Sequence, residues 1–303
     1  FIQQQKSLPK LSLLHYSLKI ALKLHKLKVQ HVHAHFAQHS CAHTITAAKL
    51  LNIPCSFVAH GHDIYNAPFD LPLKLQHNNL TIAVCQDMLH DLQQAYNGNI
   101  KLLHCGVDTH LFTPVLKPHF DNQCLKLVFV GRLIEQKGLT YLLQALNLLP
   151  RKLAVSLDII GDGDLLPSIE EQISQHDNIT LLGCKDSQWL SQNLAHYDAL
   201  VAPFCRASSG AMDTGPIVLK EAMAMAIPVI TTDLMGCKEI VTQDTGFIVP
   251  QKDSIALAQT IECLYVMPKA QRQEIGKRAR QHVQANFNAT VQAQQLSQWI
   301  EEL

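Results

Sequence analysis

Apolar and polar positions alternate along the chain in a way that predicts strands and helices in turn. Ten short runs rich in Val, Ile, Leu and Phe have the length of strands, and longer segments with helical periodicity separate most of them. Such alternation is typical of βαβ units that build a parallel sheet, and it predicts an α/β fold. The predicted strands cover residues 31–36, 54–59, 80–85, 100–104, 125–131, 153–160, 178–182, 198–202, 228–232 and 245–249.

The predicted strands fall into two groups separated by a segment that resembles a linker. Residues 106–122 carry Pro114 and Pro118 and show no clear hydrophobic period. We therefore predict a partial first domain over residues 1–115 and a second domain over residues 123–285. A final helical segment is expected over residues 286–303.

The composition argues against a nucleic-acid-binding, a disulfide-bonded or a membrane-spanning protein. The 303 residues are 47% hydrophobic, and 25 basic side chains balance 25 acidic ones, so no global charge favours a nucleic-acid partner. The nine cysteines are scattered without CxxC spacing, which favours reduced thiols over disulfides or a zinc site. With no signal peptide and no apolar run of membrane-spanning length, these features predict a cytoplasmic enzyme.

Residues 212–231 carry the most informative chemistry, in the run MDTGPIVLKEAMAMAIPVIT. Proline is favoured at the start of a helix, so Gly215-Pro216 predicts a helix over residues 216–226, with Asp213 just before it and Glu221 in its second turn. The free N–H groups of that start favour an anion such as a phosphate, and the carboxylates can hold hydroxyls on either side. The alternative is a capped helix with two solvated acids.

A second group of loops follows two predicted strands at what should be one edge of a sheet. The strand 125–131 ends in Gly131-Arg132, with Lys137 shortly after it, and the strand 153–160 is followed by a GDGD loop at residues 161–164. Ligands of open α/β sheets bind beyond the carboxyl ends of the strands. The fork of Arg132 and the point charge of Lys137 are suited to neutralise a diphosphate there.

Together these segments resemble glycosyltransferase family 4, group 1. The resemblance rests on GRL…KG at residues 131–138, on the GDGD loop and on the acid-x7-Glu segment that runs into EAMAMAIPVI. Residues 31–36, 54–65, 103–112 and 236–250 also have counterparts in the family. The resemblance implies the GT-B fold, with two Rossmann-like domains that face a cleft and a terminal helix that crosses back to the first domain. Within the family, the colanic acid and exopolysaccharide branch is most similar.

The family also implies roles for individual residues. Arg132, Lys137 and the helix that starts at Pro216 would stabilise the leaving diphosphate of a nucleotide sugar, so no metal or other cofactor is expected. Glu221 would hold ribose hydroxyls, and Asp213 a hydroxyl of the donor sugar. The family usually has Glu where this chain has Asp213. The shorter side chain leaves the identity of the donor sugar open.

His60 is the candidate catalytic residue from the first domain. It follows the predicted strand 54–59, and the family histidine at this place contacts the donor near the reacting centre. Asp63 is expected to orient His60 or to contact the acceptor, and the alternative is a loop histidine with only a structural role. The predicted catalytic residues are His60, Asp213 and Glu221, and the predicted substrate-binding residues are Asp63, Gly131, Arg132, Lys137, Gly215 and Pro216.

The other histidines invite a metal hypothesis. The chain has 17, and His31, His33 and His35 alternate along one predicted strand. Metal-binding histidines need convergent geometry and supporting partners, and no Cys or carboxylate stands at a familiar spacing beside these. Packed imidazoles are the favoured interpretation, and a metal site is the alternative.

The amino-terminal region predicts a domain that is incomplete. The chain opens with Phe1, and its first strand corresponds to the fourth strand of the family, so three strands, roughly 80–100 residues, are expected to be missing. The family's glycine-rich loop after its first strand has no counterpart here. A helix over residues 11–29 carries Lys19, Lys23 and Lys26 on a narrow polar stripe. Burial against the sheet is the favoured interpretation of its wide apolar face, and peripheral membrane contact is the alternative.

The sequence therefore predicts a retaining glycosyltransferase of bacterial polysaccharide biosynthesis. It would move a sugar from a nucleotide-diphosphate sugar to a saccharide or lipid-linked acceptor in the cytoplasm, at the inner face of the plasma membrane if membrane contact occurs. One alternative is a non-catalytic nucleotide-sugar-binding remnant. Another is a related enzyme such as a non-hydrolysing epimerase, against which the acid-x7-Glu segment speaks.

Overall fold

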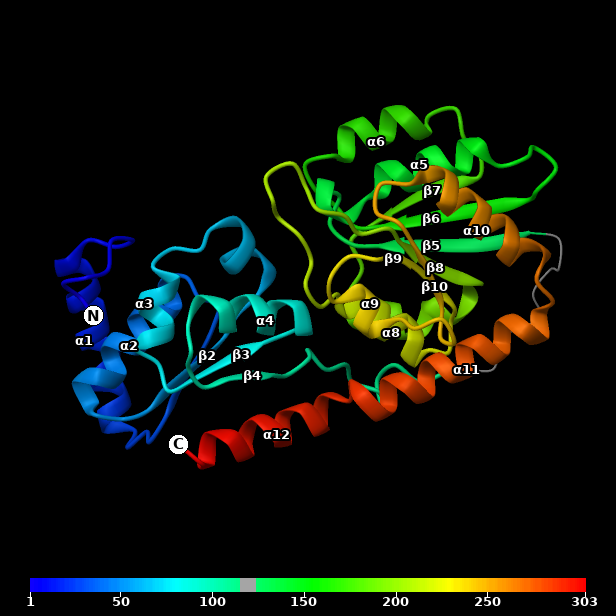
Figure 1. Ribbon diagram of the computed structural model, residues 1–303. Coiled ribbons are helices and arrows are strands. Elements are labelled where there is room, and N and C mark those ends of the chain that lie inside the picture. The colour runs from blue at the N-terminus through cyan, green and yellow to red at the C-terminus, as the bar shows by residue number, and fades with distance from the viewer. Residues whose placement is uncertain (115–123) are drawn as a thin grey trace. The chain divides into compact units, whose positions relative to one another are not determined.

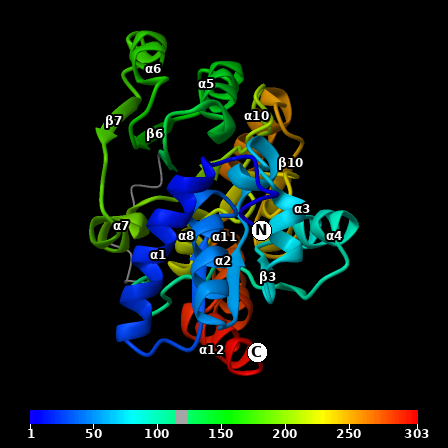
Figure 2. The same cartoon turned by 90° about the vertical axis from the view of Figure 1, so that its left-hand side faces the viewer.

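The computed structural model describes residues 1–114 and 124–303, which divide into two compact units, each built on its own parallel sheet (Figures 1 and 2). The first unit comprises residues 1–104, 209–214 and 292–303, and the second comprises residues 105–208 and 215–291. All ten predicted strands are present within the described residues, and no strand end lies more than two residues from the predicted one. The α/β class is therefore confirmed.

The sheet of the first unit has four parallel strands in the described residues, ordered β1-β2-β3-β4. Strand order follows chain order, so right-handed crossovers bring the connecting helices to the same face of the sheet. Ala34, Phe57 and Ile82 are buried on successive strands, as expected for a sheet covered by helices. The elements are α1 (Lys10–Lys26), β1 (Val32–His35), α2 (His39–Leu51), β2 (Cys55–Val58), the short helix η1 (His62–Asn66), α3 (Leu71–Gln76), β3 (Leu80–Ala83), α4 (Gln86–Ala95) and β4 (Ile100–Leu102).

The sheet of the second unit has six parallel strands in the described residues, ordered β10-β9-β8-β5-β6-β7. From β5 the chain first builds outward to β7, then returns to β8 and builds in the other direction. The junction of β5 and β8 is therefore the point at which strand order reverses, where open α/β sheets bind ligands. The strands are β5 (Leu125–Val130), β6 (Val155–Ile160), β7 (Ile179–Gly183), β8 (Ala199–Ala202), β9 (Val229–Thr232) and β10 (Phe247–Val249).

Helices cover both faces of this second sheet. The main core packs α5, α6 and α10 against one face, while α8, α9 and α11 lie on the other (Figure 1). Leu143, Leu157 and Ile261 are buried in that core, from α5, β6 and α10. The helical elements are η2 (Glu135–Lys137), α5 (Leu139–Leu148), α6 (Leu166–Ile173), α7 (Ser187–Asn193), η3 (Leu194–His196), α8 (Ile217–Ala224), α9 (Cys237–Ile240), α10 (Ser254–Val266), α11 (Lys269–Asn286) and α12 (Ala289–Glu301).

Helix α1 is less buried than its composition suggests. It packs on α2 through a narrow stripe of Leu13, Ser17 and Ala21, and the Ser17 hydroxyl lies 3.0 Å from Nδ1 of His43. The expectation that its whole apolar face is buried is therefore wrong, because α1 rests on one helix and not on the sheet. The exposed large side chains of α1 are Leu11, Leu14, Tyr16, Leu18, Ile20 and Leu22. Among the described residues, no helix combines the length and apolar content needed to cross a bilayer.

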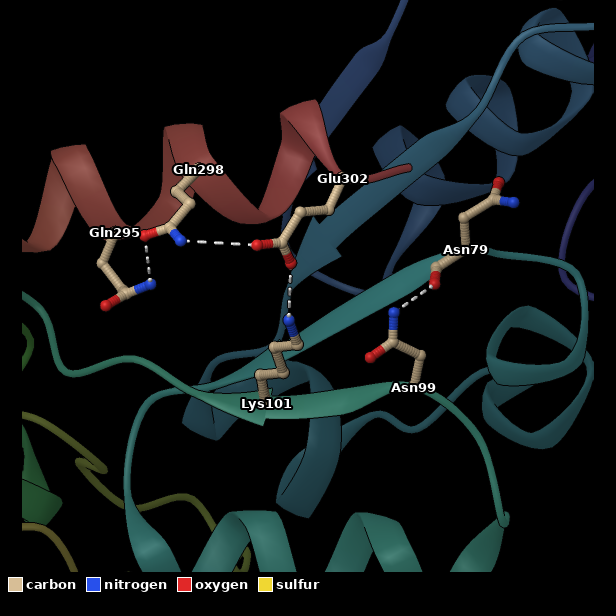
Figure 3. A network of polar contacts seen from close by, with 6 residues as sticks. All are labelled: Asn79, Asn99, Lys101, Gln295, Gln298 and Glu302. Carbon is tan, nitrogen blue, oxygen red and sulfur yellow. Dashed lines mark hydrogen bonds and ion pairs between the residues drawn. The ribbon is translucent and has the colours of Figure 1, made fainter.

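The terminal helix α12 belongs largely to the first unit. Lys101 of β4 lies 3.6 Å from the carboxylate of Glu302 (Figure 3). The Lys101 ammonium is also 4.8 Å from the ring centroid of Trp299. This return was expected from the family resemblance. The compact units otherwise differ from the predicted domains: the second begins at Cys105, and residues 209–214 join the first. Residues 115–123, which contain the predicted boundaries and part of the predicted linker, lie outside the described residues.

Candidate functional site

The loops that follow β5 and β6 interlock through their backbones. A β-carbon on Gly161, whose φ is 145°, would lie 1.9 Å from the carbonyl oxygen of Gly131. Gly163 also approaches Leu133 closely, since a β-carbon there would lie 2.6 Å from the Leu133 carbonyl oxygen. Only glycine permits such approach at these backbone angles. The GDGD loop and the GRL segment therefore lie side by side at the carboxyl edge of the sheet, as the sequence predicts.

Lys137 lies across the end of β5. Its Cδ, Cε and Cγ atoms are 3.5, 3.7 and 3.7 Å from the position that a β-carbon of Gly131 would take. Its ammonium is 4.9 Å from the ring centroid of Phe204, in the loop after β8. A β-carbon on Gly138 would lie 1.9 Å from the carbonyl oxygen of Pro203, so the two loops also meet through their backbones. Lys137 is thus fixed at the point where the strand order reverses.

Glu135 ties the same two loops together, a role that the sequence does not indicate. Its carboxylate accepts hydrogen bonds from the backbone N–H of Ser208, at 2.8 Å, and from the Ser208 hydroxyl, at 2.7 Å. These bonds lower the pKa of the Glu135 carboxyl, with the side-chain bond as the largest cause. Because the partners are 73 residues apart, no local signal could have paired them.

Helix α8 begins at the same edge of the sheet, since it connects β8 to the parallel strand β9. Pro216 has φ −60° and ψ 121° and caps the helix, which runs from Ile217 to Ala224. The predicted range of 216–226 is therefore too long at both ends, because Pro216 is extended and Ala226 is left-handed, with φ 56°. Glu221 lies in the second turn, as predicted, and burial raises the pKa of its carboxyl to about 7.

The two remaining predicted residues of this edge also lie where the sequence places them. Arg132 is exposed immediately after β5, one residue beyond Gly131. Gly215 immediately precedes Pro216 and belongs to the second unit. The second unit therefore brings two cationic side chains, a helix start and a half-buried carboxyl to one edge of its sheet.

In the first unit, Asp63 anchors the loop that carries His60. One carboxylate oxygen accepts the backbone N–H of His60 at 2.8 Å, and the other accepts the backbone N–H of Ala37, which follows β1. Asp63 is fully buried. Asp63 therefore holds the backbone of His60, and the orienting role predicted for it stays a prediction.

The imidazole of His60 lies among the side chains that end β1. Its Nε2 is 3.4 Å from Nδ1 of His35, and its ring centroid is 4.4 Å from that of Phe36. Burial, with a smaller effect from His35, lowers the pKa of His60 to about 4. His60 is therefore a neutral imidazole at physiological pH, able to donate from one nitrogen and accept at the other.

Asp213 lies in a segment that packs against Gly61, the residue after His60. A β-carbon on Gly61 would be 2.3 Å from the carbonyl oxygen of Met212 and 3.1 Å from the Thr214 side chain. Residues 209–214 accordingly belong to the first unit, although the helix that they precede belongs to the second. The sequence places Asp213 with α8 and gives no sign of its proximity to Gly61.

His33 of β1 and His31, just before the strand, both lie close to one hydroxyl. Nδ1 of His33 lies 2.6 Å from the Ser56 hydroxyl, and Nε2 of His31 lies 3.0 Å from it. Burial lowers the pKa of both imidazoles, that of His33 to about 4. In the part of the chain that the structure describes, no group of three or more His, Cys, Asp or Glu side chains is arranged to hold a metal ion.

Comparison with known families matches both units. Residues 5–111 match the family described as Glycosyltransferase Family 4, and residues 124–266 match glycosyl transferases group 1. AmsK of Erwinia amylovora, an amylovoran biosynthesis glycosyltransferase, is 27% identical over 86% of this chain and 67% of its own length. WcaL of Escherichia coli, provisionally described as a colanic acid biosynthesis glycosyltransferase, is 29% identical over 72% of this chain. The match spans only 57% of WcaL.

Solved structures show the same fold at low sequence identity. Anabaena Alr3699/HepE, in complex with UDP and glucose, matches with a TM-score of 0.79 at 19% identity, over 95% of this chain and 81% of its own. A glycosyltransferase from Rickettsia africae matches with a TM-score of 0.83 at 19% identity, over 99% of this chain and 83% of its own. With a GT-B fold and two family matches that succeed each other along the sequence, this chain belongs to glycosyltransferase family 4, group 1.

Proposed function

We propose that this protein is a retaining glycosyltransferase of bacterial polysaccharide biosynthesis. It transfers a hexosyl group from a nucleotide-diphosphate sugar to a saccharide or lipid-linked acceptor. The observation that carries the proposal is the edge of the second sheet, where Gly131 and Lys137 meet Phe204 at the reversal of strand order. The polysaccharide pathways named for AmsK and WcaL support the biological setting.

Positive charge at this edge suits the donor diphosphate. Arg132 offers a planar fork of N–H groups, Lys137 offers a point charge, and α8 begins with N–H groups that lack partners within the helix. Preorganised donors of this kind stabilise the negative charge that develops on a leaving diphosphate. We assign no metal to the reaction, because these three groups supply the charge that a metal would supply.

Glu221 suits the ribose of the donor nucleotide. With a pKa of about 7, its carboxyl exchanges between neutral and ionised forms near physiological pH. Either form accepts a hydrogen bond from a neutral hydroxyl, and the neutral form also donates one. The ligand group that contacts Glu221 is therefore expected to be a hydroxyl and not a charged group.

We assign His60 to the reacting sugar and Asp213 to one of its hydroxyls. In the proposed front-face reaction, the acceptor oxygen bonds to the anomeric carbon on the side from which the phosphate oxygen departs. The acceptor proton passes to that departing oxygen, so the nucleoside diphosphate leaves and the anomeric configuration is retained. The neutral imidazole of His60 contributes a hydrogen bond without competing for the proton.

The proposal is tested in two steps on the full chain. Calorimetric titration with UDP, GDP and ADP should show binding of at least one nucleoside diphosphate, which Arg132→Ala should weaken. UDP-glucose is the first donor to test, since HepE has been solved with it. Transfer of radiolabelled glucose to a saccharide or lipid-linked acceptor, in EDTA, should retain the α or β configuration of the donor. Binding without transfer would favour the non-catalytic alternative, and inversion would refute the proposed mechanism.

A further inference from the structure

The turn after β1 holds Phe36 in an unusual backbone conformation. Phe36 has φ 69°, in the left-handed region that residues with a side chain rarely adopt. Its N–H donates to the carbonyl oxygen of Val58 at 2.9 Å, and its ring lies 4.4 Å from that of His60. Strained backbone of this kind persists only when its surroundings fix it. The contacts that fix the Phe36 backbone are made by the next residue, Ala37.

Ala37 is held from both sides by two fully buried charged side chains. Asp63 accepts its N–H, and Lys74 of α3 donates to its carbonyl oxygen at 2.8 Å. The Lys74 ammonium also donates to the carbonyl oxygen of Phe69 at 2.6 Å. The free energy of burying an ammonium is unfavourable unless hydrogen bonds or opposite charge offset it, so Lys74 marks a specific requirement of this fold.

Asp63 also reaches His60. The second oxygen of Asp63 accepts the His60 N–H at 2.8 Å, so one carboxylate joins the loops that follow β1 and β2. Lys74 then fixes the β1 loop relative to α3. Displacement of Ala37 would move Phe36, which packs on the His60 ring.

We propose that Lys74 is a positioning residue that, with Asp63, clamps Ala37 and thereby fixes the imidazole of His60 for sugar transfer. Lys74 acts through its hydrogen bonds to backbone and contacts no substrate. The proposal deepens the proposed function, because it supplies the support that His60 needs. Small displacements of a reacting group can cost about a hundredfold in rate, so such support is consequential.

The test follows the His60 ring itself, by NMR of the full chain labelled with ¹⁵N-histidine across a pH titration. His60→Gln assigns the signals. Lys74→Met keeps the length of the side chain and removes its donors. It should shift the ring nitrogens of His60 and raise the pKa of His60 from about 4 towards 6.5, because burial is the main cause of the low value.

A second buried lysine provides the matched control. Lys220 of α8 is also fully buried and donates to the carbonyl oxygen of Cys105 at 2.6 Å, but it lies in the other unit. Lys220→Met should lower the melting temperature to a similar extent and leave the His60 signals unchanged. Should Lys74→Met fail to fold, Asp63→Asn tests the same clamp with a side chain of equal size.

The outcomes separate this proposal from the proposed function. In Lys74→Met, kcat should fall by about ten- to a hundredfold while the Kd for UDP changes less than about twofold, since the nucleotide groups lie in the second unit. His60 signals that match the wild type in folded Lys74→Met and Asp63→Asn would overturn the clamp. If those signals move but His60→Gln transfers sugar at the wild-type rate, the clamp stands and the role assigned to His60 is wrong.

Discussion

Lys137 and Gly131 lie in van der Waals proximity, with Cδ of the lysine 3.5 Å from the place of a missing β-carbon. The absence of a side chain on Gly131 lets the stem of Lys137 lie across the end of β5. The stem then directs the ammonium towards Phe204, at 4.9 Å from the ring centroid. The glycine of the GRL segment therefore determines where the Lys137 ammonium lies, at the point where the strand order reverses.

This relationship predicts that Lys137→Ala weakens nucleoside diphosphate binding without unfolding the protein. A hydrogen bond to a charged group typically contributes about 1.5–3 kcal/mol, so Kd should rise by at least about tenfold. Calorimetry measures the affinity, and thermal unfolding without nucleotide should give nearly the wild-type melting temperature. Lys277→Ala, at an exposed ion pair of α11, is the control and should leave Kd unchanged. Equal affinity in Lys137→Ala would mean that the lysine does not contact the ligand.

Gly161→Ala should disrupt the interlocked loops. The new β-carbon would lie 1.9 Å from the Gly131 carbonyl oxygen, so one loop has to move, and overpacking of this kind destabilises by about 1–3 kcal/mol. Gly183→Ala is the matched control, because Gly183 also has positive φ, 67°, but no atom lies within 4 Å of its added β-carbon. Urea unfolding should show a larger loss of stability for Gly161→Ala, with weaker nucleotide binding. Equal losses of stability in the two variants would show that the positive φ angle, and not the contact with Gly131, causes the destabilisation.

The sequence predicts the strands and the second-unit site for a common physical reason. Apolar runs of strand length identify the sheet, and parallel connections bring the residues after each strand to one edge. Gly131 and Lys137 come after β5 and Glu221 comes before β9, each in the segment next to its strand, so their positions follow from local pattern. The predicted limits of α8 were less accurate, because proline favours both the N-cap and the first turn.

Other features depend on pairs that are distant in sequence. Lys74 reaches Ala37 across 37 residues, and Glu135 reaches Ser208 across 73. No period or spacing relates such partners. The packing of Met212 against Gly61 is of the same kind, and it is why the sequence assigns residues 209–214 to the second domain while contacts assign them to the first. The prediction that the apolar face of α1 is buried against the sheet was wrong, because the composition of a helix does not specify which element it packs against.

The exposed face of α1 predicts self-association of the 303-residue chain. Leu11 and Leu22 are 84% and 56% exposed, and β1 is an edge strand of the described sheet. Apolar patches and open edges both promote association. Leu11→Gln with Leu22→Gln should reduce the mass measured by light scattering, whereas Leu148→Gln with Val266→Gln, on the second unit, should not. Equal masses for the two pairs would show that α1 is not the surface involved.

Glu221 predicts a dependence of stability on pH. Burial raises the pKa of its carboxyl from an ordinary 4.5 to about 7 in the folded protein, so between these values the folded chain holds a proton that the unfolded chain releases. The contribution of Glu221 to the free energy of unfolding is therefore greatest below pH 4.5, where the carboxyl is neutral in both states. This contribution is lost as the pH rises through 7 and the folded protein has to hold the charged form. Glu221→Gln carries no ionisable group and keeps nearly the same shape.

The melting temperature of Glu221→Gln relative to the wild type should accordingly rise with pH. The two proteins should melt at similar temperatures near pH 4.5, and the variant should melt higher above pH 7, where the wild type has a half-buried carboxylate. Glu171→Gln, at an exposed position of α6, should show no such trend. If the proposed ribose contact is correct, the variant should also bind UDP more weakly, because the amide replaces one oxygen acceptor with a donor. A difference in melting temperature that stays constant from pH 4.5 to 8 would show that Glu221 titrates normally in the folded protein.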